Sequence, residues 1–86
     1  MTENNSGPEI KTFIETIARY LVDNPDEVSV SILESGSILV AELSTNPADT
    51  GKVIGKEGRT AQALRTLLSV VGTRRGKRVM LQIVDK

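Results

Sequence analysis

The residues with the clearest binding chemistry form a glycine turn with cations beside it, Gly55-Lys56-Glu57-Gly58 followed by Arg59. Because glycine lacks a Cβ, two glycines three positions apart let the chain turn sharply and let a sugar-phosphate come close to the main chain. A helix that begins after such a turn offers free amide donors and the positive end of its dipole. Lys52, Lys56 and Arg59 would add mobile positive charge. Because a carboxylate repels phosphate, Glu57 should point away, and the turn as a whole favours binding of a phosphate backbone.

Two other phosphate-binding glycine loops do not fit this stretch. The loop of nucleotide hydrolases, Gly-x-x-x-x-Gly-Lys-Ser/Thr, needs a glycine where the chain has Thr50 and a hydroxyl where it has Glu57. The dinucleotide loop needs Gly-x-Gly-x-x-Gly directly after a strand, but Val53 occupies its first glycine position and a short helix is expected before the turn. A bare Gly-x-x-Gly turn is also common as a plain connection between helices, so the surrounding sequence has to decide.

Composition argues against an enzyme and against a metal or cofactor site. The 86 residues include no His and no Cys, so the usual general base, the most easily activated nucleophile and the two commonest transition-metal ligands are all missing. No apolar run approaches the roughly 20 residues that span a bilayer, and the N-terminal residues do not resemble a secretory signal. We therefore expect a non-catalytic, cytoplasmic protein with no cofactor and no membrane partner.

Charge is divided between the two halves of the chain, although the formal net charge is zero. Residues 1–50 contain two basic and nine acidic side chains, a net charge of −7, and residues 51–86 contain nine basic and two acidic ones, a net charge of +7. This asymmetry predicts either a polyanion-binding face opposite an acidic one, or ion pairs between the halves that use up the charges. Composition favours neither.

Apolar spacing in the first half predicts a helix followed by a β-hairpin. A helix over about residues 8–23, ended by Pro25, would carry one apolar stripe of Ile10, Phe13, Ile14, Ile17 and Leu21. Period-two alternation over residues 28–32 and strand-forming residues over 37–43 predict two antiparallel strands. The second strand is apolar on both faces, so we expect it inside the sheet or in a ligand groove.

The second half predicts two helices around the glycine turn and a final strand. N-capping residues before Pro47 predict a short helix over residues 47–54. A longer helix is expected from Arg59, with Gly72 as its C-cap and with a buried face of Ala61, Leu64, Leu67, Leu68 and Val71. Alternation over residues 78–84 predicts a half-buried strand. The predicted fold class is α+β, with the order α-β-β-α-α-β.

This order and the turn together resemble a known family. KH domains carry a Val-Ile-Gly-x-x-Gly signature, which residues 53–59 closely resemble, and the type II KH arrangement has the same element order. Residues 55–66 are similar to the Gly-Lys-x-Gly-Arg-Thr-Ala-x-Ala-Leu-Arg-Thr pattern of small bacterial proteins with a single KH domain, the KhpA or YlqC-like family. The resemblance implies a disordered N-terminus over residues 1–6 and one KH domain over residues 7–86, with a three-stranded sheet packed against three helices.

The family resemblance also implies a function and partners. Its members bind single-stranded RNA without catalysis, form homodimers and pair with KhpB, a larger protein that joins a KH domain to a second nucleic-acid-binding domain. It further implies a role as an RNA chaperone in post-transcriptional regulation linked to cell shape, cell elongation, cell wall biogenesis and envelope homeostasis.

In KH domains the turn clamps the backbone of about four nucleotides while the bases lie in a shallow groove. By resemblance, Val53, Ile54 and part of the strand over residues 38–43 would line the groove, although Val53 fits a core position equally well and Ile54 fits one better. Four basic residues after the last helix would form the opposite rim, unless they are a solvated basic turn. The expected RNA-binding residues are Lys52, Val53, Ile54, Gly55, Lys56, Glu57, Gly58, Arg59, Thr60, Arg74, Arg75, Lys77 and Arg78.

Two features predict that base recognition is weak. KH domains often have Ile three residues after the second glycine, where this chain has Ala61, a smaller groove wall. The aromatic residues are Phe13 and Tyr20, both on the first helix, so the turn has no stacking platform of the kind worth about 1–3 kcal/mol per base. Binding should then depend on phosphate contacts and fall with salt.

Two alternatives remain open. The chain could be a protein-interaction module whose Gly-x-x-Gly region is mainly a dimer interface, with RNA contacted chiefly by a partner chain. The same clamp could also hold single-stranded DNA, which the sequence does not distinguish from RNA.

Overall fold

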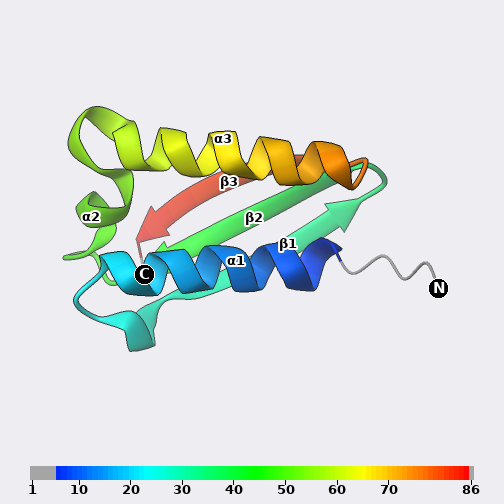
Figure 1. Ribbon diagram of the computed structural model, residues 1–86. Helices are drawn as coiled ribbons and strands as arrows, with labels where there is room; N and C mark the ends of the chain where they lie inside the picture. Colours follow the sequence, from blue (N-terminus) through cyan, green and yellow to red (C-terminus); the bar gives the residue numbers. More distant parts are fainter. Residues whose placement is uncertain (1–5, 86) are drawn as a thin grey trace.

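The computed structural model describes residues 6–85, without the side chain of Ser6. The expected disorder of residues 1–6 therefore falls largely outside the described part of the chain, and the first helix begins at Ser6. The elements are α1 (Ser6–Leu21), η1 (Pro25–Glu27), β1 (Ser29–Ser35), β2 (Ile38–Thr45), α2 (Thr50–Ile54), η2 (Lys56–Gly58), α3 (Arg59–Arg74) and β3 (Arg78–Asp85), where η marks a 3₁₀ turn (Figure 1). This confirms the predicted order α-β-β-α-α-β.

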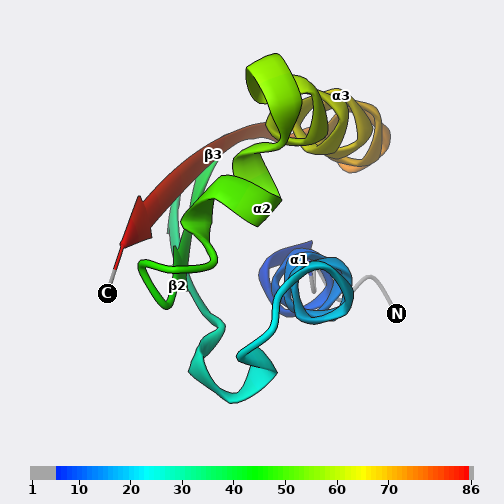
Figure 2. The same ribbon diagram turned by 90° about the vertical axis from the view of Figure 1, so that its left-hand side faces the viewer.

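The sheet has the strand order β1-β2-β3, with β1 antiparallel and β3 parallel to the central strand β2. The central position of β2 explains why its sequence is apolar on both faces. All three helices lie on the same side of the sheet, α1 over β1 and β2, and α3 over β3 (Figures 1 and 2). The prediction of a three-stranded sheet packed against three helices is confirmed.

The core lies between the sheet and the helices, where alternate residues of β2 meet two helix stripes. Leu39, Ala41 and Leu43 are fully buried on the helix-covered face, whereas Ile38 and Glu42, which alternate with them along the strand, point to the open face. The helices contribute residues three or four positions apart, as one stripe of a helix must. These buried residues are Ile10, Ile14 and Ala18 of α1 and Ala61, Leu64 and Leu68 of α3. Within residues 6–85, no helix is both long and apolar enough to cross a membrane.

Two predictions for the last helix are wrong. Leu67 is 48% exposed, because the buried stripe passes through Leu64 and Leu68 and residue 67 lies about 100° around the helix from residue 68. Gly72 is not a C-cap but a buried residue inside α3, which continues to Arg74. A Cβ on Gly72 would lie 2.6 Å from the carbonyl oxygen of Lys77, so the glycine lets α3 and the start of β3 approach closely.

The first half of the predicted short helix is also not helical. Residues 47–49 form a turn, and α2 covers only Thr50–Ile54. A helix this short has little stability of its own, since nucleation of the first turn is unfavourable. Its position must therefore be set by contacts with the rest of the domain.

Candidate nucleic-acid interface

The glycine turn joins the end of α2 to the start of α3 through backbone conformations that favour glycine. Gly55 has φ 80° and ψ 172°, and Gly58 has φ 76° and ψ 12°. A Cβ on Gly55 would lie 2.3 Å from Oγ1 and 2.9 Å from the amide nitrogen of Thr60, so the turn folds tightly against the first residues of α3. Glu57 also has a positive φ, 56°, which is uncommon for a residue with a side chain. The four residues 55–58 thus form a compact, conformationally restricted loop, called the clamp loop below.

The start of α3 lies beside the clamp loop and has no side-chain cap. The N-cap of α3 is Gly58, which has no side chain to accept a hydrogen bond from the first amides of the helix. The loop itself is closed by hydrogen bonds from the Gly55 amide to the Gly51 carbonyl oxygen, 2.8 Å, and from the Gly58 amide to the Gly55 carbonyl oxygen, 3.1 Å. The Arg59 amide donates to the Lys56 carbonyl oxygen and so belongs to the turn. An anion at this point would meet the positive end of a 16-residue helix.

The three predicted phosphate-binding cations differ in whether a carboxylate already pairs with them. Lys56 is exposed and has no carboxylate partner among the described residues. Arg59 Nη2 lies 3.4 Å from Glu57 Oε1, so the carboxylate of the clamp loop is turned toward one of these cations. Both side chains are largely exposed, and such a pair is easily exchanged for a phosphate. Lys56 is therefore the cation most available to a ligand.

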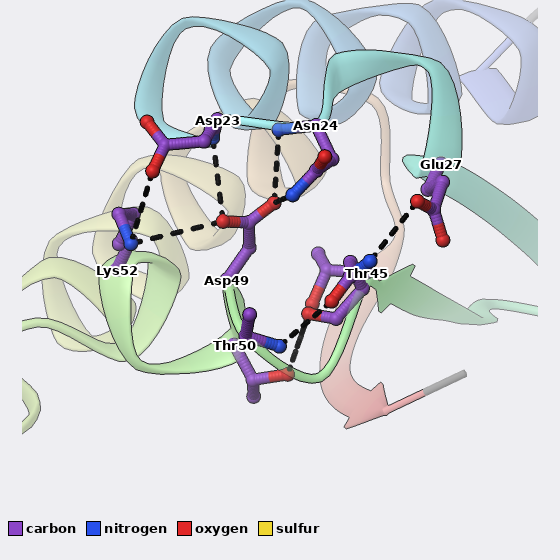
Figure 3. Close-up of polar contacts among 9 residues, drawn as sticks. Asp23, Asn24, Glu27, Thr45, Asp49, Thr50 and Lys52 are labelled. Atoms are coloured by element: carbon purple, nitrogen blue, oxygen red, sulfur yellow. Dashed lines mark hydrogen bonds and ion pairs between the residues drawn. The ribbon is translucent and has the colours of Figure 1, made fainter.

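The third cation, Lys52, belongs to a polar network at the start of α2. Its Nζ lies 3.4 Å from Asp23 Oδ2 and 3.7 Å from Asp49 Oδ1 (Figure 3). A phosphate would have to compete with two carboxylates for this amine. No local sequence pattern indicates this restriction, because Asp23 is 29 residues away in the chain.

The two apolar residues before the turn, both predicted for the groove and both also considered as core residues, differ in exposure. Val53, for which the two positions fitted equally well, is fully buried in the core, so its side chain does not line a surface groove. Ile54, for which a core position fitted better, is 39% exposed. The reason is that one side of the short helix α2 faces the core, and Val53 occupies that side.

The strand that packs beside α3, the helix that follows the clamp loop, is β3 rather than β2. The predicted groove strand, β2, is central, so its side chains lie in the core or on the open sheet face. An open hollow of about 260 Å³ is lined by Arg65 of α3 and by residues 78–81 of β3. Arg65 Nη2 donates to the Leu81 carbonyl oxygen at 3.2 Å. As an edge strand, β3 also leaves backbone groups unpaired along its outer side.

Arg65 is the residue that sequence reasoning missed in this groove. A single Arg on a helix carries no spacing signal, and its relation to β3 depends on a parallel strand pairing that local patterns do not reveal. The spacing of Arg59 and Arg65 on one basic helix was the only available hint.

The basic turn after α3 is far from the clamp loop. It lies at the opposite end of a 16-residue helix, about 24 Å away at 1.5 Å per residue (Figure 1). Arg75 forms an ion pair with Glu9 and Lys77 forms one with Glu34, so both are engaged by the acidic half of the chain. Arg78 instead lines the hollow with Arg65, and Arg74 is exposed. Of the four basic residues predicted as a rim of the groove, Arg78 is the one that lines this hollow.

The carboxylate of Asp49 is the centre of the network that holds α2. It accepts hydrogen bonds from the Asp23 amide at 3.3 Å, the Asn24 amide at 3.0 Å and the Asn24 side chain at 3.0 Å (Figure 3). Burial alone would raise the pKa of Asp49, which is 1% exposed, but these hydrogen bonds and the charge of Lys52 outweigh it and lower the pKa. The carboxylate is therefore ionised and fully engaged.

Thr50 ties the same end of α2 to the sheet. Its hydroxyl lies 3.0 Å from the hydroxyl of the buried Thr45 at the end of β2 (Figure 3). The same hydroxyl donates to Asp85 at the end of β3. Asn46 adds a hydrogen bond from its side chain to Glu27 Oε2 at 3.0 Å. The helix before the clamp loop is thus anchored to α1, η1, β2 and β3.

Comparison with known proteins agrees with this geometry. The family described as KhpA/KhpB, KH domain, matches residues 11–83. The chain is 49% identical over 76 residues to an RNA-binding protein KhpA from Aquifex aeolicus, covering 88% of this chain and 96% of that protein. It is 51% identical over 76 residues to an RNA-binding protein KhpA from Halalkalibacterium halodurans, covering 88% and 100%.

The chain belongs to the KhpA/KhpB family of KH-domain proteins. The resemblance noted in the sequence is confirmed, and with it the type II KH fold. Family membership also bears out the expectation of a non-catalytic protein, because this KH family is of a non-catalytic kind.

The one departure from the wider KH pattern has a structural explanation in this KhpA/KhpB-family chain. Ala61, where other KH domains often have Ile, is only 3% exposed and faces the interior of the domain. Its small size therefore affects packing of the first turn of α3 more than the wall of a surface groove.

Proposed function

We propose that this chain is a non-catalytic RNA-binding protein whose clamp loop, residues 55–58, holds the backbone of single-stranded RNA. The observation that carries the proposal is the loop itself, with left-handed glycines, uncapped amides at the start of α3 and an exposed, unengaged Lys56 at one point. The names of the relatives from Aquifex and Halalkalibacterium, both RNA-binding proteins, support it.

The backbone of the RNA would run from the clamp loop along the side of α3 that faces β3. Phosphates would contact the amide of Thr60, beyond the Arg59 amide that closes the turn, and the side chains of Lys56 and Arg59. Bases would then lie over the hollow between Arg65 and β3, where the unpaired edge of β3 offers donors and acceptors. The aromatic residues are on α1, with Tyr20 88% exposed away from this groove, so base stacking contributes little.

We further propose that the protein acts in the cytoplasm as an RNA chaperone, as a homodimer or with a larger KhpB-like partner, in regulation linked to cell shape and cell wall biogenesis. Exposed apolar side chains on α3, Leu67 at 48% and Val70 at 56%, support a protein contact on that helix. Pairing two domains would raise the effective concentration for a second RNA contact and offset a weak single site.

The test is fluorescence anisotropy of a short single-stranded RNA with the native protein and a Lys56→Asp, Glu57→Asp variant at several salt concentrations. Lys11→Asp is the matched control, since Lys11 is exposed on α1 and its reversal changes the net charge equally. We expect a log-log salt slope of about −2 to −3, as three or four phosphate contacts at about −0.7 each require. The clamp variant should lose binding and the control should keep it.

Light scattering on the same samples distinguishes RNA clamping from the alternative function, a protein-interaction module. If the clamp variant binds RNA as the native protein does but becomes monomeric, the loop is an interface and the interaction-module function replaces RNA clamping. A matched single-stranded DNA shows whether the site prefers RNA.

A further inference from the structure

The five-residue helix α2 delivers the chain to the clamp loop, and its orientation decides where the loop lies. Asp49 is the residue directly before α2, and Ile54, its last residue, directly precedes Gly55. Because α2 is too short to be stable alone, its direction depends on side-chain contacts at its start. Thr50 supplies those to the sheet, and Asp49 supplies those to the α1–η1 corner.

Asp49 is buried, and hydrogen bonds hold its carboxylate in place. Its carboxylate is 1% exposed and accepts three hydrogen bonds from two consecutive residues, Asp23 and Asn24, which lie between α1 and η1. Hydrogen bonds to a charged acceptor are stronger than neutral ones, and a buried acceptor left unpaired is costly. The corner after α1 and the start of α2 are thereby held in one arrangement.

We propose that Asp49 is a positioning residue for RNA binding: it fixes α2 against the α1–η1 corner and so holds the clamp loop where Lys56 and the start of α3 receive phosphates. The proposal rests on the proposed function, and it adds a residue that does not touch RNA. The effect passes through α2, whose far end is the loop.

Whether a substitution strengthens or weakens RNA binding distinguishes a positioning role from a simple effect of charge. Asp23 and Asp49 both lie within 4 Å of the Lys52 amine, at 3.4 and 3.7 Å. Neutralising either carboxylate removes one negative charge near an RNA site and frees Lys52, which on charge alone strengthens binding. Only Asp49 accepts hydrogen bonds from the corner, whereas Asp23 has an exposed side chain. Positioning therefore predicts opposite results for the two substitutions.

The experiment compares Asp49→Asn and Asp23→Asn in RNA anisotropy at low salt, under conditions where urea titration shows each protein to be folded. Asp23→Asn should bind RNA about twofold more tightly. Asp49→Asn should bind about tenfold more weakly, because its amide group faces the donors of Asn24 and Asp23. Asn24→Ala keeps the charge of Asp49 and removes one donor, and should weaken binding about threefold.

Two further measurements distinguish positioning from a general loss of stability. Val30→Ala, which truncates a buried β1 side chain outside the hydrogen-bond network of Asp49, serves as a destabilised control. Hydrogen exchange at residues 50–58 should quicken in Asp49→Asn and not in Val30→Ala. Equal loss of RNA binding in both variants, or tighter binding by Asp49→Asn, would overturn the proposal.

If the native protein binds no RNA, the proposed function fails, but hydrogen exchange still tests whether Asp49 holds the clamp loop. Faster exchange at residues 50–58 in Asp49→Asn alone would still support its hold on the loop, and unchanged exchange would overturn that hold.

Discussion

Replacing Gly55 by Ala tests the conformational requirement of the clamp loop. Gly55 has φ 80° and ψ 172°, a combination that is essentially restricted to glycine and costs about 1–3 kcal/mol for other residues. The new Cβ would also overlap the Thr60 side chain at 2.3 Å and its backbone nitrogen at 2.9 Å. Because backbone cannot move as a side-chain end can, this overlap adds about 1–3 kcal/mol. We expect the free energy of unfolding to fall by about 3 kcal/mol.

Two other glycines give graded controls for this prediction. Gly58 has φ 76° and ψ 12°, but a Cβ there meets nothing within 4 Å, so Gly58→Ala should cost only about 1–2 kcal/mol. Gly51 lies inside α2 with open space around it, so Gly51→Ala should stabilise the protein by about 0.5–1 kcal/mol.

Urea denaturation of the three variants measures these differences, and thermal unfolding should show a fall in Tm of about 10–20 °C for Gly55→Ala. Anisotropy with single-stranded RNA then reports whether the folded variant keeps the site. We expect weaker binding by Gly55→Ala, since relief of the overlap must move the loop away from the first amides of α3. If Gly55→Ala were as stable as Gly51→Ala, the conformational argument for the loop would be refuted.

Three more predictions concern charges. Glu57→Gln should raise RNA affinity about twofold at low salt, because it releases Arg59 and removes a carboxylate from the loop; unchanged affinity would show that the pair does not compete with phosphate. The pKa of Asp49 is lowered in the fold from its usual 3.8, so its contribution to stability is complete above that value and is lost as the pH falls through the lowered pKa. Acid titration of unfolding should show this loss in the native protein and not in Asp49→Asn. Arg65→Ala should weaken RNA binding about threefold with little change in stability, as expected for an exposed side chain that lines the groove; equal binding would place the RNA elsewhere.

Local patterns were sufficient to predict the three strands and the three α-helices of this fold, but not the two 3₁₀ turns or the start of α2. The long helices and β3 carry one-sided patterns, such as the i, i+3, i+4 stripe of α1 and the alternation of β3, because each is buried on one side. The clamp loop was predictable for the same reason, because its glycines are demanded by backbone geometry within five residues. Leu67 was predicted wrongly because the buried face of α3 is narrower than its apolar residues suggest. Gly72 was predicted wrongly because its place in the helix is set by a close contact with the start of β3.

Long-range placement could not be read from these patterns. Nothing local shows that β3 pairs in parallel with β2 and so borders α3, which is why the groove was expected along β2 and Arg65 was missed. Asp49 was not singled out because its partner Asn24 lies 25 residues away, and a buried aspartate in a polar stretch looks like a turn residue. The missing information was tertiary in each case.

Ion pairs between the two halves use up part of the divided charge, and what they leave determines how RNA binding should depend on salt. In the described part of the basic half, Lys52, Arg75 and Lys77 pair with carboxylates of the acidic half, and Arg59 pairs with Glu57. If all nine basic side chains of residues 51–86 neutralised phosphates, the salt slope would be about −6 at 0.7 per contact. By the proposed path of the RNA, the cations that remain are Lys56, Arg65 and Arg78, which have no carboxylate partner among the described residues, and Arg59, whose exposed pair with Glu57 a phosphate can replace. A single domain should therefore show a slope no steeper than about −3, and a steeper slope would require a second domain on the same RNA.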